Sequence, residues 1–176
     1  ITKEMIDGMF SDKPRVTFKK IAAKPHIGLV NGLYATESGT GGLTLIEIFK
    51  MPSEQKLSLE LTGQQGDVMK ESMSCAKTVA WNLLSSDFKK KIHEEWKESG
   101  NFGLHIHCPE GGTPKDGPSA GAAITTAILS CLTNIPVNNE IAMTGEIDIH
   151  GKVHAIGGLD AKLEGARIAG AKLVMV

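Results

Sequence analysis

The sequence lacks both a surplus of positive charge and a long apolar run. Its 176 residues hold 19 Lys and Arg against 20 Asp and Glu, which leaves a formal net charge of −1. A nucleic-acid-binding surface needs a basic excess, and a membrane span needs roughly 18–20 consecutive apolar residues. The first ten residues, ITKEMIDGMF, also lack the layout of a secretory signal. We therefore expect neither nucleic acid nor a membrane among the partners of this chain.

Cysteine is scarce as well. Cys75, Cys108 and Cys131 form no CxxC pair, and three thiols cannot all pair with one another. Isolated thiols in a chain of this length are typical of a reducing compartment. The sequence therefore predicts the cytoplasm, with the mitochondrial matrix as the alternative.

What the sequence does contain is enough apolar residues for one folded domain. Hydrophobic residues make up 41% and charged residues 22%, a composition that excludes a disordered chain and a coiled coil. Residues 1–25 are polar and weakly periodic, and we expect them to be a lead-in or linker from a preceding module. We expect the domain to span residues 26–176 and to be truncated at its C-terminus, because the chain ends abruptly at an apolar run.

The hydrophobic pattern predicts strands first. Three strand candidates, at 26–36, 42–51 and 56–62, are separated by Gly- or Pro-containing turns, which is typical of antiparallel hairpins. From residue 67 onward the period changes to that of a helix. The expected buried face of this helix comprises Met69, Ser72, Met73, Ala76, Ala80 and Leu83.

The second half of the chain mixes helices and strands. An amphipathic helix that carries Phe88, Ile92 and Trp96 is expected to end at Gly100. The remaining expected elements are a strand at 102–107, a loop at 110–117, a buried helix at 120–132, strands at 141–147 and 152–156 around a turn at 148–151, a helix at 158–170 and a strand from 172. Because strands and helices do not alternate regularly, the predicted fold class is α+β, with a mixed sheet and helices.

Ser119, in the segment PKDGPSAG, is the candidate nucleophile. It stands where a Gly- and Pro-rich loop meets an apolar helix, and Pro118 suits the first turn of such a helix. Amide N–H groups at a helix start, here in the stretch from Gly117 to Ala120, can stabilise an oxyanion on a carbonyl that the serine attacks. The alternative is that Ser119 only caps the helix.

The letters GPSAG also match G-x-S-x-G, the nucleophile elbow of α/β-hydrolases, so an esterase of that class is an alternative function. The elbow requires a strand that runs directly into the serine, whereas a Pro- and Gly-containing loop precedes Ser119. Only His150 and His154 follow the serine, and both lie beside the predicted turn at 148–151. This context argues against the elbow.

Lys162 is the candidate base for the serine. The expected apolar face of the predicted helix 158–170 comprises Leu159, Leu163, Ala166 and Ala169 or Gly170. Lys162 follows Leu159 by three residues and precedes Ala166 by four, which places it on or beside this face. Burial disfavours the charged form of lysine, so a buried amine can be neutral near pH 7 and accept the serine proton. The alternative is a lysine that lays its stem along apolar surface and keeps its amine in water.

Three segments then match the pattern of a known family. They are HIHCPEGGTPKDGPSAG at 105–121, MTGEIDIHGKV at 143–153 and IGGLDAKLEGARIAGA at 156–171. In order and spacing they resemble the proteolytic domain of Lon proteases, and PKDGPS is similar to the Lon A subfamily. The weaker segment TGQQGDVMKES at 62–72 resembles that domain too, so the resemblance runs from about Gly28 to the end of the chain.

The resemblance implies a serine endopeptidase of α+β fold that cuts unfolded polypeptides with a Ser–Lys dyad, here Ser119 and Lys162. It also implies that the Thr144 hydroxyl hydrogen-bonds and orients the lysine amine. An amine on a four-carbon side chain would otherwise sample many rotamers.

Further residues match the family at positions around the dyad. Asp116 matches an acidic residue that can occlude the dyad in inactive forms, and Glu146 matches a residue that helps tune the site. His105 and His107 match a His-x-His motif of secondary importance. These four are therefore expected to support the dyad rather than to carry the reaction.

The resemblance further implies a homo-hexamer, and a preceding ATPase module that binds ATP and Mg and feeds unfolded protein to this domain. Within the chain itself no GxxxxGK[S/T] motif occurs, and the glycine-rich segment SGTGGLT at 38–44 lacks the lysine that contacts phosphate. We therefore expect no cofactor and no metal in this chain.

Two other functions stay open from the residues alone. His105 and His107 lie two positions apart, on one face of a predicted strand, as a metal pair would; Cys108 points the other way and Glu110 is the nearby carboxylate. A sheet with helices also resembles folds found in ribosomal proteins, so an RNA-binding or assembly module is the non-enzyme alternative. The balanced charge and the lack of a basic or aromatic stripe count against RNA.

Overall fold

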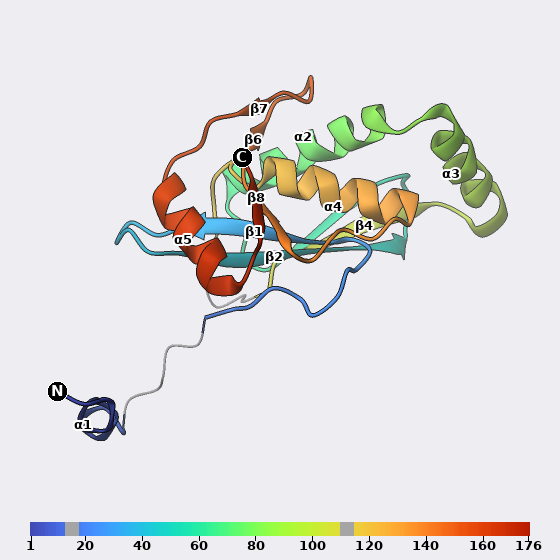
Figure 1. Cartoon of the computed structure of the whole chain (residues 1–176). Coiled ribbons are helices and arrows are strands. Elements are labelled where there is room, and N and C mark those ends of the chain that lie inside the picture. The colour runs from blue at the N-terminus through green and yellow to red at the C-terminus, as the bar shows by residue number, and fades with distance from the viewer. Residues whose placement is uncertain (13–17, 110–114) are drawn as a thin grey trace.

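The structure is a computed structural model, and it describes residues 1–12, 18–109 and 115–176. Their order of elements is α1 (Lys3–Met9), β1 (Leu29–Ala35), β2 (Gly41–Pro52), β3 (Leu59–Thr62), α2 (Asp67–Leu83), α3 (Ser86–Ser99), β4 (Phe102–His107), α4 (Gly121–Thr133), β5 (Ile141–Met143), β6 (Glu146–Ile147), β7 (Val153–His154), α5 (Leu159–Ala169) and β8 (Leu173–Met175). A mixed sheet carries helices on both of its faces (Figure 1). The predicted α+β class is confirmed.

The main sheet has the strand order β3-β4-β2-β1-β5-β8. The predicted hairpin between β1 and β2 is confirmed, since the two strands pair antiparallel with Gly32 opposite Thr44. The predicted hairpin between the second and third strands is wrong, because β4 lies between them, antiparallel to β2 and parallel to β3. The inward side chains of β4 are almost fully buried, which suits an inner position, whereas the short, half-exposed β3 suits an edge.

The strand predicted over 141–147 is interrupted after Met143. The Thr144 amide donates to the Met175 carbonyl (3.0 Å), and the Gly145 amide donates to the Ser119 carbonyl (2.8 Å). Beyond this break, β6 pairs with β7 in a separate two-stranded ribbon around the predicted turn. Gly145 suits the break because a Cβ there would lie 2.6 Å from the Val153 side chain. The chain thus leaves the main sheet at the point where it meets the serine.

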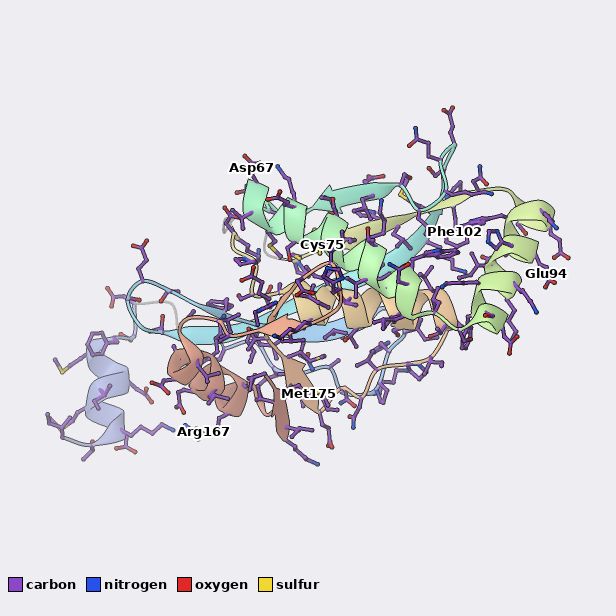
Figure 2. The ribbon with its side chains drawn as sticks, turned by 90° about the horizontal axis from the view of Figure 1, so that it is seen from above. Asp67, Cys75, Glu94, Phe102, Arg167 and Met175 are labelled. Atoms are coloured by element: carbon purple, nitrogen blue, oxygen red, sulfur yellow. The ribbon has the colours of Figure 1, made fainter. Side chains whose placement is uncertain are left out.

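The main core lies between one face of the sheet and helices α2 and α4. It includes Ile46 and Ile48 of β2, Leu104 of β4, and Ile124 and Ile128 of α4, all at most 1% exposed. Seen from above, α2 runs from Asp67 past Cys75 toward α3, which carries Glu94 at the far end of the layer (Figure 2). Helix α4 sits beneath α2 and is buried on most sides, as its apolar composition predicts.

One expected core residue of α2 is misplaced. Leu83 is 61% exposed, and Leu84, at 5%, takes the buried position instead. The helix ends at Leu83 and Leu84 adopts an extended conformation, so the helical period no longer sets the direction of its side chain. The other five residues predicted for this buried face are buried, which confirms the rest of the pattern.

Helix α5 packs on the opposite face of the sheet, where Leu33, Ala142 and Ala166 form a second cluster. Glycines let its backbone approach the sheet closely. A Cβ on Gly165 would lie 2.4 Å from the Gly42 amide nitrogen, and one on Gly41 would lie 2.0 Å from the Ala161 carbonyl oxygen. The buried face of α5 is therefore made of small residues and one lysine.

This close contact also changes the predicted face of α5. Leu159 and Leu163, expected to be core residues, are 38% and 40% exposed. The residues that face the sheet are Lys162, Gly165, Ala166 and Ala169. Two leucines could not fit where the helix and strand backbones nearly touch.

The N-terminal residues contain a short helix that the sequence pattern did not predict. No residue of α1 is buried, and Figure 1 shows it apart from the sheet. Ile21, farther along, joins the domain through a hydrogen bond that its amide donates to the Ala169 carbonyl (3.1 Å). The domain boundary at residue 25 stays a prediction. Within the described part of the chain, no helix combines the length and apolar character that crossing a bilayer requires.

We expect Gly165→Ala to lower the free energy of unfolding by about 1–3 kcal/mol, because the new methyl group has to push α5 away from β2. In an open helix the same change is favourable by about 0.5–1 kcal/mol. Gly8→Ala in α1, where a Cβ would meet no atom within 4 Å, is the matched control. Urea unfolding measures both variants. Equal stabilities for the two alanine variants would contradict the packing argument.

Candidate active site

Ser119 lies two residues before α4 and is half-buried. The N-cap of α4 is Ala120, and no side chain caps this helix end, so the interpretation of Ser119 as a helix cap is wrong. Pro118 is not in the first helical turn either. The Gly121 amide donates to the Pro118 carbonyl (3.1 Å), which forms a tight turn over 118–121, and the helix begins only after it. A turn rather than a strand precedes the serine, which excludes the α/β-hydrolase elbow.

The break after β5 fixes the backbone of Ser119. Its carbonyl oxygen accepts from the Thr144 hydroxyl (3.1 Å) and from the Gly145 amide (2.8 Å). The Gly145 carbonyl in turn accepts from the Ala122 amide (3.0 Å). These bonds tie the start of α4 to the interrupted strand, so the serine and the threonine share one rigid corner.

Lys162 points into the protein from the first turn of α5. It is 4% exposed, and its Nζ donates to the Thr144 hydroxyl at 3.3 Å. Within the described residues it makes no ion pair. Burial lowers the pKa of its amine, because desolvation disfavours the charged form. The predicted inward position is confirmed, and a lysine with its amine held in water is excluded.

Ser119 and Lys162 line one pocket of about 380 Å³. The Ser119 hydroxyl makes no hydrogen bond to another described residue, so it remains available to a substrate or to the amine. Thr144 joins the two residues, because its hydroxyl accepts from the lysine amine and donates to the serine carbonyl. Other residues of the pocket wall are Leu33, Tyr34, Ala35, Thr36, Glu37, Thr44, Met69, Lys115, Asp116, Gly117, Ala120, Gly157 and Gly158.

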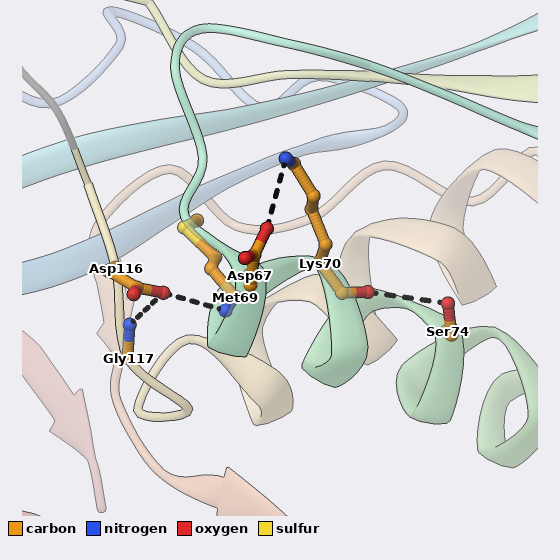
Figure 3. A network of polar contacts seen from close by, with 6 residues as sticks. All are labelled: Asp67, Met69, Lys70, Ser74, Asp116 and Gly117. Carbon is orange, nitrogen blue, oxygen red and sulfur yellow. Dashed lines mark hydrogen bonds and ion pairs between the residues drawn. The ribbon is translucent and has the colours of Figure 1, made fainter.

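Asp116 lies on the rim of this pocket, with its carboxylate directed at helix α2. Oδ1 accepts from the Met69 amide (2.9 Å) and from the Gly117 amide (2.8 Å), as Figure 3 shows. These two bonds hold the pKa of Asp116 below its usual value. The carboxylate thus contacts the first turn of α2 and makes no hydrogen bond to Lys162.

The structure places the other predicted residues away from this pocket. Both His105 Nε2 (2.9 Å) and His107 Nδ1 (2.7 Å) hydrogen-bond the Thr62 hydroxyl, on the sheet face opposite α2 and α4. Cys108 is buried in the main core. Glu110, the carboxylate suggested as their companion, lies outside the described residues. Across the residues that the structure covers, no three His, Cys, Asp or Glu side chains gather as metal ligands would.

Glu146 is exposed on β6 and lines a different hollow, together with Ser72, Cys75 and Pro118. Sequence reasoning in turn missed the pocket wall from Leu33 to Glu37, which the end of β1 and the turn after it contribute. Nothing in the local pattern of these residues marks them as functional. They reach the site only because β5 stops pairing with β1 at Gly32, which leaves the end of β1 beside the serine.

An α+β domain with a serine and a buried lysine on one pocket has the side chains of a Ser–Lys hydrolase. The whole chain, residues 1–176, matches the model of the Lon protease (S16) C-terminal proteolytic domain. The chain belongs to this family, whose members are serine peptidases.

Named relatives agree with this assignment. A Lon protease homolog of Acanthamoeba polyphaga mimivirus is 45% identical over 181 residues, which cover 100% of this chain and 17% of that protein. The Lon protease of Haemophilus influenzae is 47% identical over 162 residues, 92% of this chain and 19% of that protein. The Lon protease of Buchnera aphidicola subsp. Acyrthosiphon pisum is 46% identical over 163 residues, which cover 92% of this chain and 20% of that protein. The chain thus spans about a fifth of the length of these relatives.

Replacing the buried lysine should stabilise the fold near neutral pH. Lys162→Met removes an amine that is buried and has no counterion in the part of the chain that the structure describes. We expect it to raise the free energy of unfolding by about 1–3 kcal/mol. Between the lowered folded-state pKa and the ordinary value of 10.5, the unfolded chain binds more protons, so wild-type stability rises with pH. The difference between Lys162→Met and wild type should therefore shrink as pH approaches 10.5.

Urea unfolding between pH 7 and pH 10 measures this difference. Lys152→Met is the control, because Lys152 is exposed, and it should change stability by less than about 0.5 kcal/mol at every pH. A Lys162→Met difference that stays constant with pH would show that the amine is already solvated.

Proposed function

We propose that this chain hydrolyses peptide bonds with Ser119 as nucleophile and Lys162 as general base. The observation that carries the proposal is a lysine 4% exposed, without an ion-pair partner in the described residues, on the same pocket as a serine whose hydroxyl is unengaged. A lysine with a lowered pKa supplies a neutral amine that can take the serine proton.

The reaction proceeds in two stages. The neutral Lys162 amine removes the Ser119 proton while the serine oxygen attacks the scissile carbonyl. The ammonium then protonates the departing amine of the peptide, and the acyl chain stays on Ser119 as an ester. In the second stage the lysine activates a water molecule, which releases the acid and restores the serine. Thr144 keeps the amine in place throughout, because its hydroxyl accepts from Nζ.

The oxyanion requires amide donors beside the serine. Around this site the Gly117, Gly121 and Ala122 amides donate to Asp116, Pro118 and Gly145 respectively. In the described residues the amides of Ser119 and Ala120 have no acceptor. We therefore assign the stabilisation of the oxyanion to these two N–H groups. The sequence alone indicated the longer stretch from Gly117 to Ala120 for this role.

An extended polypeptide suits this pocket better than a folded protein. Strand β1 runs past its last pairing with β5 at Gly32, so Leu33–Ala35 present a free backbone edge along the pocket. An extended segment can add to such an edge by main-chain hydrogen bonds. A cleft of about 380 Å³ accepts a few side chains of an unfolded chain and no compact domain. We therefore assign unfolded proteins as substrates.

The proposal extends to a longer protein. Residues 38–44 form a hairpin turn and the start of β2, with the Thr36 and Thr40 hydroxyls 2.6 Å apart, and no lysine there could hold a phosphate. We propose that ATP and Mg bind to an ATPase module elsewhere in the whole protein. That module would deliver unfolded chains to a homo-hexamer of this domain. A cytoplasmic location, with the mitochondrial matrix as the alternative, agrees with three free cysteines.

Replacing either member of the dyad should abolish cleavage of an unstructured fluorogenic peptide while leaving the fold intact. We expect Ser119→Ala and Lys162→Ala to lower kcat by about 10³-fold or more. Lys162→Arg should not restore activity, because a guanidinium stays charged and cannot accept a proton. Wild-type kcat/KM should fall as pH drops through the lysine pKa. Near-normal turnover by a Lys162 variant would refute the dyad, as would a flat profile down to pH 5.

The Thr144 hydroxyl can be tested separately from the dyad. Thr144→Val keeps the shape but loses the bonds to Lys162 and to the Ser119 carbonyl, so we expect kcat to fall about 10- to 100-fold. Thr144→Ser keeps the hydroxyl and should retain activity within about threefold of wild type. Steady-state kinetics on one peptide compares the two. Equal activities for the valine and serine variants would remove Thr144 from the mechanism.

A further inference from the structure

The loop that carries the serine docks onto the residues that precede and begin α2. The Gly66 amide donates to the Lys115 carbonyl (2.7 Å), and the Lys115 amide donates to the Gln64 carbonyl (3.0 Å). These two bonds form an isolated parallel bridge between Gln65 and Lys115. The segment just before Ser119 is therefore aligned with the start of α2.

Asp116 then supplies the cap that α2 lacks. The N-cap residue of α2 is Gly66, which has no side chain to accept from the first free amides of the helix. The Asp116 carboxylate fills this place from 47 residues away in sequence, with Oδ1 2.9 Å from the Met69 amide. A Cβ at position 66 would lie 2.3 Å from the Asp116 carboxyl carbon, so the glycine leaves the space that the carboxylate occupies.

The same oxygen also holds the chain on the serine side. It accepts from the Gly117 amide (2.8 Å), and Gly117 has a φ of +108°, a conformation that favours glycine, where the chain turns toward Ser119. Figure 3 shows the carboxylate between the Met69 and Gly117 nitrogens. One carboxylate oxygen thus connects a rigid helix start to the loop two residues before the nucleophile.

We propose that Asp116 is a positioning residue that holds the Ser119 loop in its reactive arrangement by capping helix α2. This inference rests on the proposed function, since it assigns Asp116 a task in the placement of the nucleophile. It differs from the occluding role that the family resemblance suggests for this residue, and the two roles predict opposite results. Removal of an occluding carboxylate raises activity, whereas removal of a positioning carboxylate lowers it.

The test compares three variants of the whole chain on one unstructured peptide. Asp116→Ala removes the acceptor, and we expect kcat to fall about 10- to 100-fold with KM changed by less than about threefold. Asp116→Asn keeps an amide oxygen, and Asn is a good cap, so it should stay within about threefold of wild type. The pH profile of Asp116→Ala should keep the wild-type midpoint, because the lysine environment is unchanged.

Asp67→Ala is the matched control. Asp67 is also a carboxylate in the first turn of α2, but its side chain is fully exposed. Among the described residues it pairs only with Lys70, at 3.4 Å. The Asp67→Ala variant loses the same charge at the same end of α2 but keeps every contact of the serine loop. Its kcat should stay within about twofold of wild type. An Asp116→Ala variant that is as active as wild type, or more active, would overturn the proposal, as would equal losses for Asp67→Ala and Asp116→Ala.

Amide hydrogen exchange gives a readout that does not depend on catalysis. The Met69 and Gly117 amides should exchange faster in Asp116→Ala than in Asp67→Ala. If Asp116→Ala does not fold, hydrogen exchange of the wild-type chain still tests the cap. The Met69 and Gly117 amides should then be protected relative to the Asp67 amide, for which no described residue is an acceptor. Unprotected Met69 and Gly117 amides would refute the cap even if Ser119→Ala abolishes cleavage. If both amides are protected but the Ser119→Ala variant still cleaves the peptide, the cap is supported and the dyad is refuted.

Discussion

The burial of the Lys162 amine, with no counterion among the described residues, is the constraint on which the rest of this site depends. It requires helix α5 to lie directly on the sheet, because only then is the side chain covered on all sides. Gly41 and Gly165 make that approach possible, since a Cβ on either would collide with the facing backbone. A stability cost at one lysine is thus built into the packing of an entire helix, and it is the same desolvation that lowers the pKa of the amine.

The interrupted strand after Met143 connects this lysine to the serine. A continuous strand over 141–147 would keep Thr144 and Gly145 in the ladder of the sheet, with their backbone groups paired to neighbouring strands. Because the strand breaks, the Gly145 amide and the Thr144 hydroxyl both reach the Ser119 carbonyl. The irregular backbone therefore places two hydrogen-bond donors at the serine, which a regular strand could not do. Such departures from regular structure are typical of functional sites.

The sequence predicted those parts of the structure that depend on local pattern. The inward position of Lys162 follows from helical spacing, and the irregular backbone at 115–118 before Ser119 follows from Gly and Pro, while residues 110–114 of the predicted loop lie outside the described residues. The insertion of β4 between β2 and β3 could not be predicted, because strand order depends on contacts between residues far apart in sequence. The same holds for the contact of Asp116 with α2 and for the wall built by Leu33 to Glu37. The exposure of Leu159 and Leu163 escaped prediction because a glycine, not a leucine, sets the distance between α5 and the sheet.

Ser119 is held from two sides by bonds of different character, and this has a consequence for its response to acid. On the side of Thr144 the Ser119 carbonyl accepts from a hydroxyl and from the Gly145 amide, two donors that do not themselves change charge in this pH range. On the side of α2 the bond depends on the Asp116 carboxylate, whose pKa lies below its usual value. Because the Asp116 pKa lies below the ordinary value of 3.8, this carboxylate stays charged at every pH above that value. Under the proposed mechanism, loss of activity above pH 3.8 would then come from protonation of Lys162, while the serine loop keeps its position.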